Sequence, residues 1–192
     1  MSTRTAATTV AAIDPSLAST GLARLTTREG RWVAETSLVT STGRRSDTLR
    51  QRHQRLRDIT TDVTDYVADA DLVVIEGPAM ASRGGSTVDR HGLWWRIVAT
   101  VTDRSTPMLV VPPTSRAKFA TGKGNADKAA VAAAVVRMWP EADIATSDAA
   151  DALALASLGA AAADLPVPFP LPQYRTDVLA AVVPEPSKEH TP

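Results

Sequence analysis

The stretch Thr146-Ser147-Asp148-Ala149-Ala150-Asp151-Ala152-Leu153-Ala154-Leu155-Ala156 is the most informative part of this chain. Its alanine and leucine content predicts a helix over residues 148–163. Residues three apart on a helix share a face, so Asp148 and Asp151 are expected to present two carboxylates together. The same pair also fits a helix start, with Asp148 as the N-cap and Asp151 at the third helical position. The two interpretations are compatible.

Two further acids end short apolar runs elsewhere in the chain. Asp14 follows the run 9–13, and Glu76 follows the run 72–75. Two strand ends and a helix start can meet at one edge of a sheet, and four carboxylates there repel one another unless cations lie between them. The pattern predicts a divalent-metal site, and the usual substrate of such a site is a phosphodiester. Taken alone, Asp14 before Pro15 is also typical of a turn.

Hydrophobic periodicity predicts an α/β fold. Its order, βββ-α-β-α-β-α-α, describes a mixed five-stranded sheet with three antiparallel strands first, flanked by helices. The basic, glycine-containing segment 114–125 has no expected helix or strand. The expected strands cover 6–14, 17–26, 31–40, 72–75 and 108–111, and the expected helices cover 46–70, 87–103, 126–138 and 148–163.

The chain is expected to form one domain over residues 1–164. Residues 165–192 carry prolines at 166, 168, 170, 172, 184, 186 and 192, and are expected to be an extended arm or a disordered tail. The lack of cysteine excludes disulfides and thiolate metal sites. No signal peptide or membrane span is visible, which predicts a soluble, cytoplasmic protein with no membrane association.

The net charge of the chain bears on whether it can bind nucleic acid. The chain has 21 Lys and Arg against 21 Asp and Glu, a net charge of zero. Nucleic-acid enzymes usually carry a basic surplus, so the basic residues here would have to gather on one face. The arginine-rich run 44–57 is either a solvated helix face or a DNA contact.

Four motifs resemble those of the ribonuclease H-like nucleases and, within them, the RuvC-type Holliday junction resolvases. The motifs are an opening strand and turn at 12–21, the acidic strand end 74–76, the basic run 121–128 and the closing motif 146–156. The resemblance spans residues 11–160. Cellular resolvases carry an aromatic residue shortly after the second acid, where this chain has Gly77-Pro78-Ala79-Met80. That difference, with the run 120–125, resembles phage-encoded members and implies a host-cell cytoplasmic location.

The resemblance implies a structure-selective DNA endonuclease acting in recombination and repair. Asp14, Glu76, Asp148 and Asp151 would be its catalytic residues and metal ligands, with two Mg²⁺ or Mn²⁺ ions per site. Its partners would be branched DNA, especially four-way junctions, and a second copy of the chain in a homodimer. Lys118, Lys123, Lys128 and Arg83 are the expected DNA contacts.

Three other functions stay open on the sequence alone. A broader branched-DNA nuclease would cut flaps and forks, and a non-catalytic protein would only bind junctions. An actin-like ATPase would need a second domain to enclose its nucleotide, which a chain of this length does not provide. Trp94 and Trp95 cannot share one side of a helix, so one is expected in the core and the other at the surface or a dimer interface.

Overall fold

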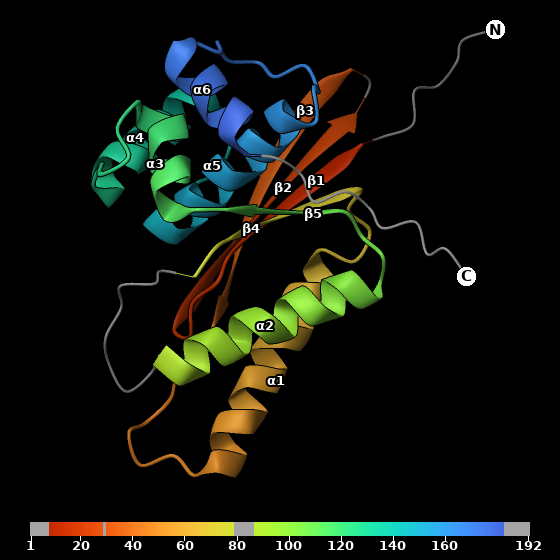
Figure 1. The fold of residues 1–192 in the computed structure, drawn as a ribbon, viewed down its shortest axis with the longest axis vertical. Coiled ribbons are helices and arrows are strands. Elements are labelled where there is room, and N and C mark those ends of the chain that lie inside the picture. Colours follow the sequence, from red (N-terminus) through yellow and green to blue (C-terminus); the bar gives the residue numbers. More distant parts are fainter. Residues whose placement is uncertain (1–7, 29, 79–86, 183–192) are drawn as a thin grey trace, which may run out of the picture.

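The chain forms a five-stranded mixed sheet with helices on both faces (Figure 1). The structure, a computed structural model, describes residues 8–28, 30–78 and 87–182. The strands lie in the order β3-β2-β1-β4-β5, with β1, β2 and β3 antiparallel and β4 and β5 parallel to β1. This confirms the predicted α/β class and the three leading antiparallel strands. The strands are β1 (Thr9–Asp14), β2 (Ser19–Arg28), β3 (Arg31–Thr40), β4 (Leu72–Glu76) and β5 (Met108–Val111).

The helices form one layer on each face of the sheet (Figure 1). One layer contains α1 (Leu49–Tyr66) and α2 (Thr87–Asp103). The other contains α3 (Pro113–Thr121), α4 (Lys128–Met138), α5 (Ser147–Ala162) and α6 (Gln173–Ala181). Strand β1 contributes Val10 and Ala12 to the core under α5, and Ala11 and Ile13 to the core under α1 and α2. Alternate residues of a strand point to opposite faces, so a strand covered on both faces is apolar throughout.

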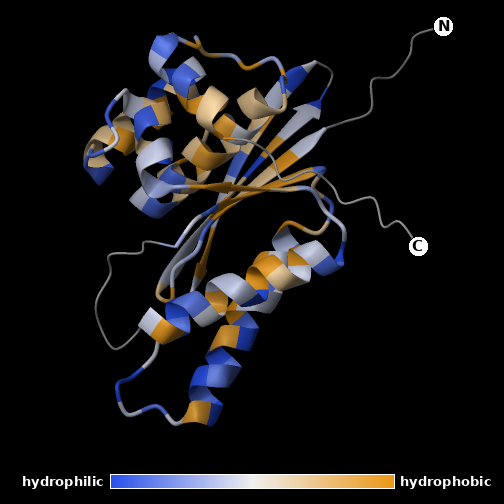
Figure 2. Cartoon of the chain, in the orientation of Figure 1, coloured by the Kyte–Doolittle hydropathy of each residue, from blue (hydrophilic) through white to orange (hydrophobic). Residues whose placement is uncertain are grey.

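Helix α5 is the central helix of its layer. Residues 149–161 are all buried, and apart from Asp151 and Ser157 they are small or apolar (Figure 2), as expected for a helix enclosed by a sheet and other helices. Two glycines allow its close approach to the sheet. A Cβ at Gly21 would overlap the backbone carbonyl of Asp148, and one at Gly159 would overlap the Val74 side chain.

Several element boundaries follow directly from the sequence. The strands at 31–40 and 108–111 and the helix at 87–103 have the expected ends. The helix expected over 46–70 is shorter, because Thr48 and Gln51 form a capping box that begins α1 at Leu49.

Helix α3 is absent from the predicted order of elements, which has no helix between residues 111 and 126. Pro113 occupies the first helical position, where a missing N–H costs nothing. Gly122, with φ of 84°, ends the helix in the left-handed conformation that glycine adopts readily. Both signals are present in the sequence, but the basic character of the segment obscured them.

The expectation of an extended or disordered arm is wrong for residues 165–182. Phe169 and Val178 belong to the main core, and the Phe169 ring packs edge-on against Trp139 with centroids 5.7 Å apart. Arg175 is 5% exposed and donates to the carbonyls of Phe119 (2.9 Å) and Pro170 (2.6 Å). The prolines therefore lead into a helix that completes the core. Residues 183–192 lie outside the described part of the chain.

No helix in the described ranges is both long and apolar enough to span a bilayer.

Candidate active site

The ends of β1 and β4 bring Asp14 and Glu76 to one edge of the sheet. The two strands are parallel neighbours in which Ile13 pairs with Ile75, so the acid that follows each lies at the same level. The turn after Asp14 is held by Thr20, which is fully buried. Its hydroxyl donates to the carbonyl of Ser16 (2.7 Å) and accepts from the Ser16 amide (3.1 Å).

Helix α5 supplies the other two predicted carboxylates. Its N-cap is Thr146, whose hydroxyl accepts from the amide of Ala149 at 3.1 Å. The interpretation of Asp148 as the N-cap is therefore wrong, and Asp148 lies in the first helical turn. Asp151 follows one turn later and is 1% exposed. Because α5 begins directly over Gly21, the position of both acids depends on that close contact.

Arg116 of α3 joins the carboxylates of two different elements. Its Nε donates to Oε2 of Glu76, and its Nη1 donates to Oδ1 of Asp151. The three side chains are 11%, 14% and 2% exposed. A guanidinium suits this role because it presents several N–H groups in a rigid fork. Sequence reasoning missed Arg116 because nothing in its local motif indicates that α3 faces the acids.

Lys128, expected to contact DNA, also lies at the acidic cluster. Its Nζ is 2.9 Å from Oδ1 of Asp148, and its side chain is 65% exposed. Exposed ion pairs of this kind contribute little to stability. Lys128 therefore lies beside the cluster, and its ion pair with Asp148 is weak.

Burial and mutual repulsion strongly perturb two of the four carboxylates. Burial, followed by the charge of Glu76, raises the pKa of Asp14 to about 7, although Arg116 opposes the rise. Burial raises the pKa of Asp151 to about 6, against the opposing charges of Arg116 and Lys128. Burial also disfavours ionised Asp148, but hydrogen bonds from Lys128 and Ser19 outweigh it and lower its pKa. The cluster thus holds more negative charge than its two cations neutralise.

The four carboxylates are suitable ligands for a hard divalent cation, but their side chains are not arranged around a single metal position. All four groups are carboxylates, the ligand type that Mg²⁺ and Mn²⁺ prefer. Within the described residues, no three acidic or histidine side chains are arranged to hold a metal ion. Arg116 pairs with both Glu76 and Asp151, so its guanidinium lies between these two carboxylates.

Trp94 of α2 contacts the backbone of the site, and the sequence did not indicate it as a site residue. Its indole N–H donates to the carbonyl of Glu76 at 2.9 Å, which fixes the end of β4 from α2. Trp94 packs against the core under α1 and α2, whereas Trp95 is 64% exposed. The expected division of this pair between core and surface is confirmed.

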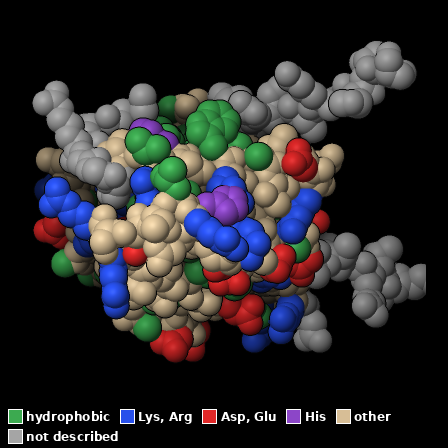
Figure 3. Space-filling view, turned by 90° about the horizontal axis from the view of Figure 1, so that it is seen from below, with side chains coloured by type: hydrophobic (Ala, Val, Ile, Leu, Met, Phe, Trp, Pro, Cys, Tyr) green, Lys and Arg blue, Asp and Glu red, His purple; other side chains and the backbone are tan. Residues whose placement is uncertain are grey.

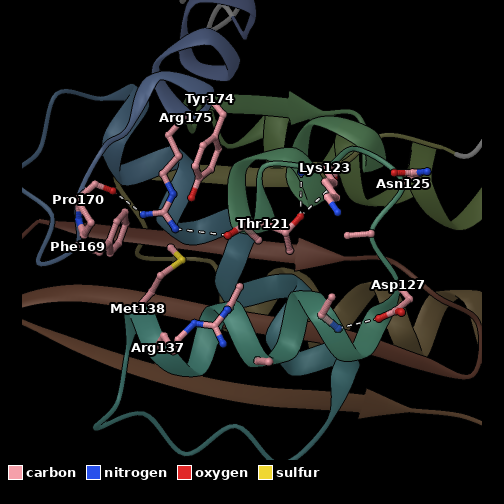
Figure 4. Close-up of a pocket in the computed structure, with 15 residues that line it drawn as sticks. Thr121, Lys123, Asn125, Asp127, Arg137, Met138, Phe169, Pro170, Tyr174 and Arg175 are labelled. Carbon is pink, nitrogen blue, oxygen red and sulfur yellow. Dashed lines mark hydrogen bonds between the residues drawn. The ribbon is translucent and has the colours of Figure 1, made fainter.

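The remaining predicted DNA contacts are spread more widely. Lys118 is half-buried on α3, and Lys123 is exposed in the connection between α3 and α4. Lys123 lines a cavity of about 710 Å³ between that connection, α4 and α6, and none of the four carboxylates lines it (Figure 4). Arg83 lies outside the described residues.

Two arginines of the run 44–57 make contacts that stabilise the fold. Arg52 pairs with Asp89 of α2 (Nε to Oδ2, 2.9 Å), and Arg55 donates to the carbonyl of Leu17 (2.6 Å). These contacts tie α1 to its neighbours. On the face at the α1 and α2 end of the molecule, basic and acidic side chains are mixed (Figure 3). This face therefore does not supply the single basic surface that a neutral chain would need.

The fold and the placement of the acids define a ribonuclease H-like protein. Acids end β1 and β4, and a third element, α5, adds two more from its first turns. A family model described as crossover junction endodeoxyribonuclease RuvC matches residues 10–158. The chain belongs to the RuvC family.

Solved structures agree with this fold. Thermus thermophilus RuvC matches with a TM-score of 0.63 and 19% identity, over 84% of this chain and 99% of that one. T. thermophilus RuvC in complex with a Holliday junction substrate matches with a TM-score of 0.64 and 18% identity, over 92% and 99%. At these identities the likeness establishes the fold alone. The comparison with curated proteins finds no match.

Proposed function

We propose that this chain is a metal-dependent endonuclease that nicks four-way DNA junctions in recombination and repair. The observation that carries the proposal is the convergence of Asp14, Glu76, Asp148 and Asp151 in a RuvC-family chain, from three separate elements. The raised pKa of Asp14 supports it, because crowded carboxylates are stabilised by bound cations. T. thermophilus RuvC, which shares this fold, has been solved with a Holliday junction substrate.

The four carboxylates would hold two Mg²⁺ or Mn²⁺ ions. When bound, such a pair activates a water and stabilises the leaving oxygen of a phosphodiester. Lys128, beside the cluster, would bind a backbone phosphate there as a positive charge. Lys118, Lys123 and Arg83 would bind further backbone phosphates of the same DNA. Trp94 and the buried hydroxyl of Thr20 would keep Glu76 and Asp14 in position.

We also infer a homodimer. One chain carries one acidic cluster, whereas resolving a four-way junction needs two nicks in symmetry-related strands. Val88 and Trp95 of α2 are 74% and 64% exposed. Being seven residues apart, they lie on one face of the helix and offer an apolar surface for a second copy. The assignment to phage-encoded members stays a prediction.

The first test is cleavage of an end-labelled four-way junction in Mg²⁺. The wild-type chain should nick near the crossover, and EDTA should abolish nicking. Asp14→Asn should lose at least about 100-fold in rate while keeping junction binding, because it removes a metal ligand rather than a DNA contact. Asp62→Asn, which changes an exposed carboxylate on α1, is the matched control and should cut normally.

The outcomes separate the alternatives. Cutting of flaps and forks in preference to junctions would favour a broader branched-DNA nuclease. Binding without metal-dependent cutting on any branched substrate would favour a junction-binding protein. Normal cutting by Asp14→Asn would refute the site itself.

A further inference from the structure

Arg116 lies within the acidic cluster and contacts more of its carboxylates than any other described cation does. Its guanidinium contacts Glu76 and Asp151 at once, and its charge also acts on Asp14. A single side-chain cation thus interacts with three of the four carboxylates. Lys128 pairs with the fourth, Asp148.

We propose that Arg116 is a positioning residue that serves as an internal counter-cation. It holds Glu76 and Asp151 together in the metal-free protein and competes with divalent metal for the same two carboxylates. The inference rests on the proposed metal-dependent function and adds a property to it. Metal affinity is set by the displacement of a guanidinium as well as by the number of acids.

The competition follows from the atoms that Arg116 uses. Carboxylates only accept, and one oxygen of each, Oε2 of Glu76 and Oδ1 of Asp151, already accepts from the guanidinium. Charge-assisted hydrogen bonds in a buried setting are strong, so metal has to displace a stable partner. A guanidinium also keeps its charge at any working pH, so deprotonation cannot release it.

Helix α3 does not have to move for this exchange. Neighbouring Ala117 and Phe119 are buried in the core, and Arg175 of α6 donates to the carbonyl of Phe119 at 2.9 Å. The helix backbone is therefore anchored independently of the Arg116 side chain. A long, flexible side chain can turn away from Glu76 and Asp151 while the helix stays in place.

Lys128 is not an equivalent competitor. Its side chain is 65% exposed and contacts only Asp148, whereas the Arg116 side chain is 11% exposed and forked. Solvent screens the lysine pair far more. The effect on metal affinity is therefore expected to come chiefly from Arg116.

The test is calorimetric titration of Mn²⁺ and of Mg²⁺ into the metal-free full chain. Arg116→Gln should bind each ion at least about tenfold more tightly than wild type, which corresponds to about 1.4 kcal/mol. The same variant should melt at a lower temperature without metal, because Glu76 and Asp151 then lose their shared cation. Its melting temperature should rise more than that of wild type when Mn²⁺ is added.

Arg24→Gln is the matched control. Arg24 also pairs with a carboxylate, Asp69, at 2.6 Å, but outside the cluster. Its loss should lower the melting temperature slightly and leave metal affinity unchanged. Arg116→Lys keeps the charge without the fork and should bind metal with an affinity between those of wild type and Arg116→Gln, which also provides a variant if the glutamine form does not fold.

Two results would overturn the inference and are distinguishable. If wild type binds metal and Arg116→Gln binds it equally or more weakly, Arg116 is a structural support of the metal site, and the proposed nuclease function stands. If neither chain binds Mn²⁺ or Mg²⁺, both the inference and the metal-dependent function fail.

Discussion

Asp14 differs from the other three acids of the cluster because, among the described residues, no cation pairs with it directly. Burial and the charge of Glu76 raise its pKa to about 7, against an ordinary value of 3.8. The metal-free site is therefore expected to gain or lose a proton near neutral pH. This makes Asp14 the residue through which pH acts on the site.

The metal-free protein should lose stability as pH rises towards 7. A carboxyl whose pKa is higher in the folded than in the unfolded state binds more protons when folded, so its stabilising effect is complete below about 4 and disappears as pH passes about 7. Asp151, with its pKa raised to about 6, acts in the same direction. Melting temperatures measured in EDTA from pH 4.5 to 8 should fall, and Asp14→Asn should flatten the curve. An unchanged slope in that variant would show that Asp14 is not the titrating group.

The residues that the sequence could identify are those that lie at ends of regular patterns. Asp14 and Glu76 end apolar runs, and Asp148 and Asp151 begin an alanine-rich helix. Arg116 and Trp94 could not be found in this way. Their roles depend on which direction α3 and α2 face, and that direction is decided by packing between distant segments.

At the scale of elements, the close contact of α5 with β2 positions half of the cluster. Gly21 leaves no room for a Cβ, because that atom would overlap the carbonyl of Asp148. The glycine of the motif 20–21 is therefore required by the packing of α5 as well as by the turn. A side chain there has to push the start of α5 away from the sheet.

Gly21→Ala should destabilise the fold by about 1–3 kcal/mol through overpacking. It should also reduce junction cleavage by about 100-fold, since displacements near 1 Å in an active site have costs of that size. Denaturant unfolding and cleavage rates at a temperature where the variant is folded measure the two effects. Gly159 lies on α5 roughly 17 Å from Asp148, the residue that Gly21 contacts. Gly159→Ala should therefore show a similar stability loss with a smaller effect on cleavage. Equal effects of both variants on cleavage would contradict the positional role of Gly21.

Two helices show where local patterns mislead. α3 has a proline start and a glycine end, but it is short and lies in a basic, glycine-containing segment for which no helix is predicted. α6 follows four prolines in alternation, a composition typical of an extended arm. What makes it part of the domain is tertiary packing: Phe169 fills a space beside Trp139 and Phe119, and Arg175 binds carbonyls at the end of α3. Composition alone does not reveal such partners.

At the scale of the whole molecule, a chain with zero net charge must bind DNA through local charge. Within the described ranges, the two basic side chains at the acidic cluster, Arg116 and Lys128, both pair with its acids. Divalent cations would change this balance, because they neutralise the carboxylates and release these side chains.

The most direct measurement of the central claim uses a supercoiled plasmid that extrudes a cruciform. A homodimer with one acidic cluster per subunit should cut both strands within one binding event and yield linear DNA in Mg²⁺. Asp14→Asn should leave the plasmid supercoiled. Nicked circles in place of linear product would contradict the paired sites, and an intact plasmid with wild-type protein and Mg²⁺ would contradict the nuclease function.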